Sequence, residues 1–158
     1  MTHSGRAVVT LPGDTQIHVR REFDAPRHLV YRAWTEPELV ARWWAGDRGK
    51  VTSIETDLRV GGAWRWVMEA NAGFEVAFHG VYTEIVPNER ISRTEVFEAM
   101  PAEQCVSTLT FTEKDGRTIV ELLVQHTSQG NRDAHAANME DGIQEAMDHL
   151  DRVLTSLG

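Results

Sequence analysis

The chain has 158 residues, 41% hydrophobic and 25% charged, a composition typical of one soluble globular domain. Its 16 Lys and Arg residues against 24 Asp and Glu residues give a net charge of −8, which opposes nucleic-acid binding because that binding depends on neutralising phosphates. The single Cys105 excludes an intramolecular disulfide, and no apolar run reaches the roughly 20 residues that cross a bilayer. With no signal peptide at the N-terminus, we expect a cytoplasmic protein without membrane insertion.

The first part of the chain predicts one strand followed by two short helices. Apolar and polar side chains alternate over Thr15–Phe23, which is typical of a half-buried strand. A proline in its first turn favours a helix over Pro26–Trp34. Thr35 and Glu38 have the spacing of a capping box and predict the start of a second helix, which ends near Gly46.

From residue 51 onward the apolar period changes to two residues, which predicts consecutive β-strands. Short turns rich in Gly, Pro, Asn and Asp separate these strands, so neighbouring strands are expected to be antiparallel. The predicted segments are 51–58, 63–69, 75–85, 91–98, 104–112 and 118–126.

The last stretch, Asn131–Leu157, carries the longest helical pattern. Apolar residues recur at steps of three and four, and polar residues fill the positions between them. So long an amphipathic helix needs a large apolar surface, which only the strands can provide. We therefore expect an α+β fold in which a curved antiparallel sheet of about six or seven strands wraps around the long C-terminal helix. Residues 1–14 form a leader or edge strand, and a single domain spans residues 15–158.

A curled sheet that grips a helix leaves space at one end of the helix, which predicts an internal cavity. The inward faces carry aromatic and Met side chains typical of small-molecule pockets, although the same side chains also build ordinary cores. Gly142, in the middle of the helix, costs about 1 kcal/mol relative to Ala and indicates a close approach of sheet or ligand. The candidate ligand-binding residues are Trp34, Trp43, Trp64, Trp66, Met68, Phe78, Tyr82, Arg93, Glu95, Met139, Ile143 and Met147.

Arg93 and Glu95 share one face of the strand 91–98. If that face points inward, they form a buried charged pair suited to ligand orientation or acid–base chemistry. If it points outward, they are ordinary surface charges, and the apolar residues of the strand leave both registers open.

Histidines supply the other candidate polar groups. His126 ends the last strand on its apolar face and is the better candidate for a polar group at the pocket mouth. His79, His135 and His149 are predicted to face solvent. The sequence has no phosphate loop, nucleophile elbow or paired-His metal motif, so we expect no cofactor or metal and assign no catalytic residue.

Three segments carry a resemblance. They are Phe23-Asp24-Ala25-Pro26 through Trp43-Trp44, Asp57–Arg65, and Gly80–Pro87 with Glu89-Arg90. Together they resemble the signatures of the activator-of-heat-shock-protein-ATPase-like family, within the START-like or polyketide-cyclase-like (SRPBCC) superfamily, over roughly residues 16–157. The resemblance implies a helix-grip fold with a deep apolar cavity under the C-terminal helix. Members of this family commonly carry Gly-Trp where this chain has Gly142-Ile143, and the smaller side chain would enlarge or reshape the cavity.

Three functions remain open at this point. The aromatic cavity favours binding of a small apolar or aromatic molecule, such as a lipid or polyketide-like metabolite. An enzyme of the cyclase, dehydratase or hydrolase type would need titratable groups converging in the cavity, for which Arg93, Glu95 and His126 are candidates. A module that regulates a chaperone ATPase in the stress response is what the family name implies. A homodimer, through an exposed strand edge or Trp44, is also open.

Overall fold

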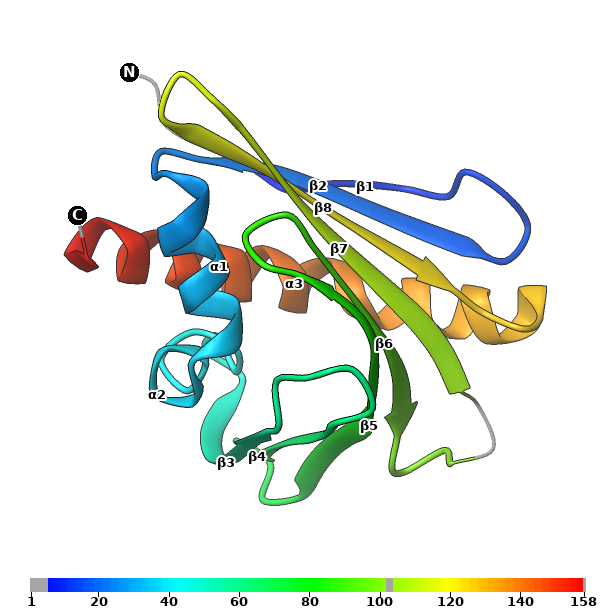
Figure 1. Ribbon diagram of the computed structural model, residues 1–158. Helices are drawn as coiled ribbons and strands as arrows, with labels where there is room; N and C mark the ends of the chain where they lie inside the picture. The colour runs from blue at the N-terminus through cyan, green and yellow to red at the C-terminus, as the bar shows by residue number, and fades with distance from the viewer. Residues whose placement is uncertain (1–5, 102–103, 158) are drawn as a thin grey trace.

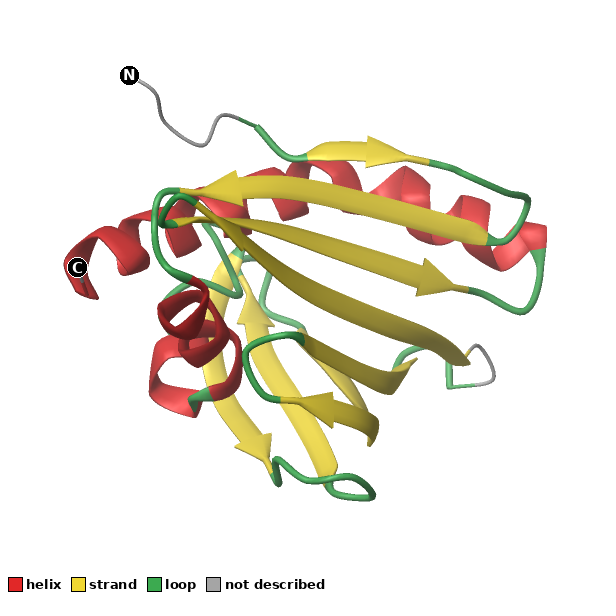
Figure 2. Cartoon of the chain, turned by 45° about the horizontal axis from the view of Figure 1, so that its top comes forward, coloured by secondary structure: helices red, strands yellow, loops and turns green. Residues whose placement is uncertain are grey.

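The computed structural model describes residues 6–101 and 104–157, which form one eight-stranded antiparallel sheet and three helices (Figures 1 and 2). The strand order is β1-β2-β8-β7-β6-β5-β4-β3. The elements are β1 (Val8–Thr10), β2 (Gln16–Phe23), α1 (Arg27–Thr35), α2 (Pro37–Val40), β3 (Gly49–Thr56), β4 (Ala63–Ala70), β5 (Glu75–Val86), β6 (Arg90–Phe97), β7 (Gln104–Lys114), β8 (Arg117–Gln125) and α3 (Gln129–Leu157).

The arrangement confirms the predicted α+β fold with a long C-terminal helix. The sheet curves, α3 lies across one of its faces, and α1 and α2 lie at one end (Figure 1). The sheet has eight strands rather than six or seven, because β1 pairs with β2 and adds a short strand at the edge. None of the helices in residues 6–101 and 104–157 combines the length and apolar character that crossing a membrane requires.

Strand β2 shows how the alternating pattern builds the core. Ile17, Val19 and Phe23 point inward and are almost completely buried. Arg21 shares this inward face, and its guanidinium donates to Asp148 of α3 over 2.8 Å. The charged side chain is accommodated because its partner comes from the helix that the sheet grips.

The junction of the two short helices differs from the prediction. Thr35 is the last residue of α1, and its hydroxyl donates to the carbonyl of Tyr31, one turn earlier in that helix. Glu36 takes the N-cap position of α2 without a side-chain hydrogen bond, and the predicted capping box is wrong. Helix α2 ends at Val40, and the chain continues to Gly46 in successive turns that hold two tryptophans against the sheet.

Helix α3 has two parts that pack differently. Leu150, Val153 and Leu154 are buried against the sheet and α1, which closes the core at that end. Met139 and Ile143, about three and two turns before Leu150, are only half-buried. The first part of the helix therefore packs less tightly than the last.

Two polar side chains hold the first part of α3 in place. Arg132 is buried, and its guanidinium donates to the carbonyls of Gly13, in the β1–β2 connection, and Gln16, at the start of β2. The Gln144 side-chain amide accepts from the Ala7 N–H over 3.0 Å and donates to the Ala7 carbonyl over 2.7 Å. The helix is thus tied to the sheet edge even where apolar packing is incomplete.

Candidate functional site

A cavity of about 480 Å³ lies between the first part of α3 and the inner faces of β4 to β8. Trp34 of α1, with Trp43 and Trp44 of the following turns, forms one end of it. The strands contribute large apolar side chains, and α3 contributes smaller or flexible ones, including Met139 and Gly142. The predicted cavity side chains therefore come together from the sheet, from α3 and from the segment that contains the short helices.

The aromatic wall is built from rings that meet edge to face. Trp66 of β4 contacts Trp43, Trp44 and Trp64, with ring centroids 6.4, 5.6 and 5.6 Å away. Phe78 of β5 adds a further edge contact to Trp44 at 5.8 Å. Such pairs prefer defined geometries, so the wall presents fixed ring faces to the space that it encloses.

Arg93 and Glu95 of β6 lie on the inward face, which decides the register that the sequence left open. Their side chains are 16% and 17% exposed, and the shortest distance between Arg93 Nη2 and Glu95 Oε1 is 3.8 Å. The Arg93 guanidinium lies 3.7 Å from the ring centroid of Trp64 and 4.5 Å from that of Trp66. A cation held over tryptophan faces is attracted by the ring quadrupole, which offsets part of the cost of burying it.

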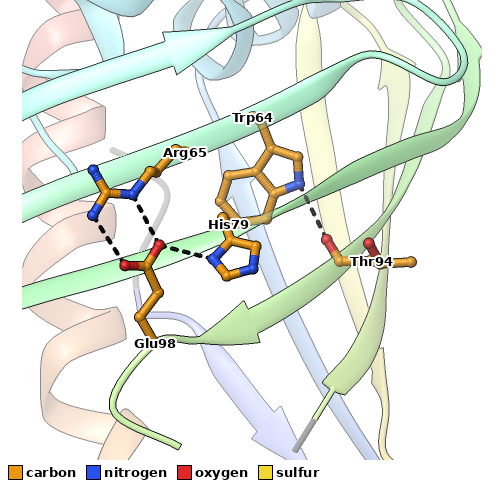
Figure 3. Close-up of polar contacts among 5 residues, drawn as sticks. All are labelled: Trp64, Arg65, His79, Thr94 and Glu98. Carbon is orange, nitrogen blue, oxygen red and sulfur yellow. Dashed lines mark hydrogen bonds and ion pairs between the residues drawn. The ribbon is translucent and has the colours of Figure 1, made fainter. Parts of the chain in front are cut away.

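The tryptophan beneath Arg93 is itself fixed. Trp64 Nε1 donates to the Thr94 carbonyl of β6 over 3.1 Å (Figure 3). Gly80 of β5 pairs with Trp64 and lies so close to Thr94 that a β-carbon at this position would overlap its carbonyl oxygen. Gly80 has no β-carbon and therefore lets β5 and β6 approach each other beside Arg93 and Glu95.

A separate polar cluster occupies the opposite, outer face of the same strands. Arg65 donates through two nitrogens to Glu98, both at 2.9 Å, and His79 Nδ1 lies 2.8 Å from the same carboxylate (Figure 3). These hydrogen bonds lower the pKa of Glu98 to about 2. His79 is exposed, as predicted from its strand face, and does not face the cavity.

Two histidines meet at the end of the cavity near the start of α3. His126 Nε2 lies 2.8 Å from His135 Nδ1, and both residues line the cavity. Burial lowers the pKa of His135, which favours the neutral ring. The prediction that His135 faces solvent is wrong, because the helix turns this residue onto the end of β8. His149, also predicted to face solvent, has Nε2 2.9 Å from Asp47 Oδ1.

Cys105 and Ser107 of β7 also line the cavity. Burial raises the pKa of the Cys105 thiol to about 12, so this side chain is neutral near pH 7 and is a poor nucleophile. Within residues 6–101 and 104–157, no three His, Cys, Asp or Glu side chains converge in a way that could hold a metal ion.

The structure brings ten of the twelve candidate residues to the cavity surface: Trp34, Trp43, Trp66, Met68, Phe78, Tyr82, Arg93, Glu95, Met139 and Ile143. The other two, Trp64 and Met147, lie in the buried core just outside the lining, where Trp64 supports Arg93. A β-carbon added at Gly142 would lie 3.7 Å from the Arg48 side chain, an ordinary contact, so no close approach of the sheet explains this glycine.

Several lining residues were not among the sequence candidates. The strand β7 contributes Cys105, Ser107 and Leu109, whose spacing of two residues indicates one shared face. That alternation was visible in the sequence, but small and polar side chains did not suggest an aromatic cavity. Trp44 and Phe97 also line the space, and contacts across the sheet place them there.

Comparisons with solved structures show the same fold. A crystal structure of a Rhodobacter sphaeroides protein is 24% identical, with a TM-score of 0.90 over 96% of this chain and 99% of that chain. A Chromobacterium violaceum protein is 27% identical, with a TM-score of 0.78 over 90% and 98% of the two chains. A Mycobacterium smegmatis protein is 22% identical, with a TM-score of 0.84 over 96% and 98%.

Sequence comparisons bear on the family. A search of curated proteins gives no match. The sequence model described as "Activator of Hsp90 ATPase homolog 1-like protein" matches residues 24–155, which include both short helices, the sheet from β3 to β8 and nearly all of α3. The chain therefore belongs to the family of Activator of Hsp90 ATPase homolog 1-like proteins.

Proposed function

We propose that the protein binds a small apolar or aromatic molecule in the cavity between the sheet and α3. The observation that carries this proposal is the space of about 480 Å³ lined by Trp34, Trp43, Trp44 and Trp66. Small-molecule sites are typically concave, largely apolar and a few hundred Å³ or more in volume, with a small number of polar groups. A packed core of the same residues would have closed this space, because protein interiors approach crystal density.

The experiment is a titration with a neutral polycyclic aromatic probe, 2-methylnaphthalene, followed through tryptophan emission. Because four tryptophans line the cavity, a bound aromatic ring should change their emission in a saturable way. Calorimetry under the same conditions gives an independent dissociation constant and stoichiometry. One site per chain is the expected result.

Two variants make the titration specific for the cavity. Ile143→Trp replaces an aliphatic side chain of the lining with a larger aromatic one. It should weaken probe binding by at least about tenfold, because the space for the probe is filled. Val106→Thr changes an exposed side chain on the outer face of β7, between the lining residues Cys105 and Ser107, and should leave binding unchanged. Equal affinities for the wild type and Ile143→Trp would contradict the proposal.

One observation favours a second candidate function. Arg93, Glu95 and His126 all line the cavity, and an acid–base enzyme needs titratable groups that face its bound substrate. In such an enzyme Glu95 would accept a proton from the substrate while Arg93 stabilised developing negative charge. Glu95→Gln should then abolish turnover of a cavity-bound substrate without abolishing its binding, whereas a binding protein shows no turnover to lose.

A further inference from the structure

The Arg93–Glu95 pair leaves most of its hydrogen-bonding capacity unused. The closest distance between the two side chains, 3.8 Å, exceeds that of a hydrogen bond. Neither side chain forms a hydrogen bond to any other residue in the part of the chain that the structure describes. Donors and acceptors left open at the wall of a largely apolar cavity point to a ligand group that would complete them.

The guanidinium is also fixed in orientation. Its Cζ lies 3.7 Å from the ring centroid of Trp64, and this ring is itself hydrogen-bonded to the Thr94 carbonyl. Trp66 contacts the same guanidinium at 4.5 Å. The two rings restrict the guanidinium, and the N–H donors on its edge are preorganised because the fork is rigid.

The local charge balance decides what kind of group fits. Arg93 and Glu95 together carry no net charge, and their cross-strand partners Ser107 and Cys105 are uncharged. The other guanidinium at the cavity, that of Arg48, is paired with Glu145 at 3.4 Å. A carboxylate ligand would meet Arg93 favourably but would stand beside the Glu95 carboxylate, and like charges repel strongly away from bulk water.

We infer that the cavity selects a neutral aromatic ligand that carries a carbonyl acceptor next to an N–H or O–H donor, as in a carboxamide. This inference rests on the proposed binding function. The carbonyl oxygen accepts from the edge of Arg93, and the neighbouring donor reaches the Glu95 carboxylate. The aromatic body of the ligand packs against the tryptophan wall, chiefly Trp66 and Trp44.

The test uses three matched naphthalenes at neutral pH: 2-naphthamide, 2-naphthoate and 2-methylnaphthalene. The wild type should bind the amide about tenfold more tightly than the hydrocarbon, since a net hydrogen bond to a charged group is worth about that much. It should also bind the amide about tenfold more tightly than the carboxylate, because the Glu95 carboxylate repels a ligand of like charge. Glu95→Gln keeps the shape but leaves Arg93 as the only charge of the pair, so the order of amide and carboxylate should invert. Arg93→Met should weaken amide binding more than hydrocarbon binding, because the ligand carbonyl loses its donor, and so narrow the gap between the two affinities.

The outcomes separate the two proposals. A wild-type protein that binds the carboxylate as tightly as the amide, or an order unchanged in Glu95→Gln, overturns this inference while leaving the binding function in place. Failure of all three naphthalenes to bind overturns the binding function and this inference with it. Val106→Thr, with its change on the outer face, should keep the wild-type order.

Discussion

The two parts of α3 use one amphipathic pattern for different ends. In residues 147–157, here the closed part, the apolar side chains Met147, Leu150, Val153 and Leu154 are 4% exposed or less. In residues 129–146, here the cavity part, Met139 and Ile143 are half-buried beside a space of about 480 Å³. An apolar stripe that continues along a helix therefore does not predict how tightly each part of that helix packs against the sheet.

The sharpest way to break this comparison is to truncate one side chain in each part. Leu150→Ala should lower the free energy of unfolding by about 2–5 kcal/mol, because it opens a void in a completely buried site. Ile143→Ala should cost about 1 kcal/mol or less, since part of this side chain already faces open space. Urea denaturation of both variants measures the difference, and equal losses would mean that the cavity part is as tightly packed as the closed part.

The wall of the cavity part can be tested through Gly80. Gly80→Ala should cost about 1–3 kcal/mol, because its β-carbon would overlap the Thr94 carbonyl and force β5 and β6 apart. The same shift should weaken probe binding, since Thr94 also holds the Trp64 ring. The control is Gly130→Ala at the start of α3, where a β-carbon meets nothing within 4 Å. Loss of stability in the control but not in Gly80→Ala would contradict the geometry described here.

The pair of His126 and His135 should make the free energy of unfolding depend on pH through the cavity part of α3. His135→Ala removes the hydrogen bond to His126 and should cost about 1 kcal/mol above pH 7. Burial lowers the folded-state pKa of His135 below its unfolded value of 6.5, so the unfolded chain binds the proton more readily. Wild-type stability should therefore fall as the pH drops below about 6.5.

This pH dependence should be shallower in His135→Ala, as unfolding free energies measured from about pH 8 to 5 would show. His28→Ala, at an exposed position of α1, serves as the control and should keep the wild-type slope. An unchanged slope in His135→Ala would show that the buried ring does not govern this region of pH.

The smallest effect is expected on the outer face of the sheet. Glu98→Gln removes the ion pair with Arg65 and should cost about 0.2–1 kcal/mol near pH 7, because the pair is partly exposed and screened. The folded-state pKa of Glu98, about 2, lies below its ordinary value of 4.5. Its contribution is therefore complete above about pH 4.5 and is lost as the pH falls towards 2. Thermal unfolding across this range measures it, and any change in probe affinity would contradict the outer-face assignment.

Most of the fold follows from periodicity alone. Alternation predicted the strands from β2 to β8, and the steps of three and four in residues 131–157 predicted α3. The capping box at Thr35 failed because α1 extends through Thr35, which leaves Glu36 at the N-cap position of α2. The three-residue strand β1 has too few residues to show a period, and its pairing with β2 depends on chain segments on both sides of a turn.

The candidate site was predictable in its aromatic part and less so in its polar part. Large aromatic side chains on an inward strand face can be recognised from residue type and alternation, so most of them were identified. Whether Arg93 points inward depends on which face of β6 the neighbouring strands bury, and the strand's own residues do not determine it. His135 was missed because its partner, His126, lies on another element, and only the packing of α3 on β8 brings the rings together.

The hydrogen bonds between Gln144 and the backbone of Ala7 give the start of the chain an influence over a cavity whose lining does not include Ala7. The side-chain amide acts as one more strand partner at the sheet edge and fixes α3 at the end of its cavity part. Trimming the chain through β1 would free this turn of the helix while leaving every lining residue in place. Affinity for a cavity ligand would then depend on how the first ten residues are handled in expression, tagging or proteolysis.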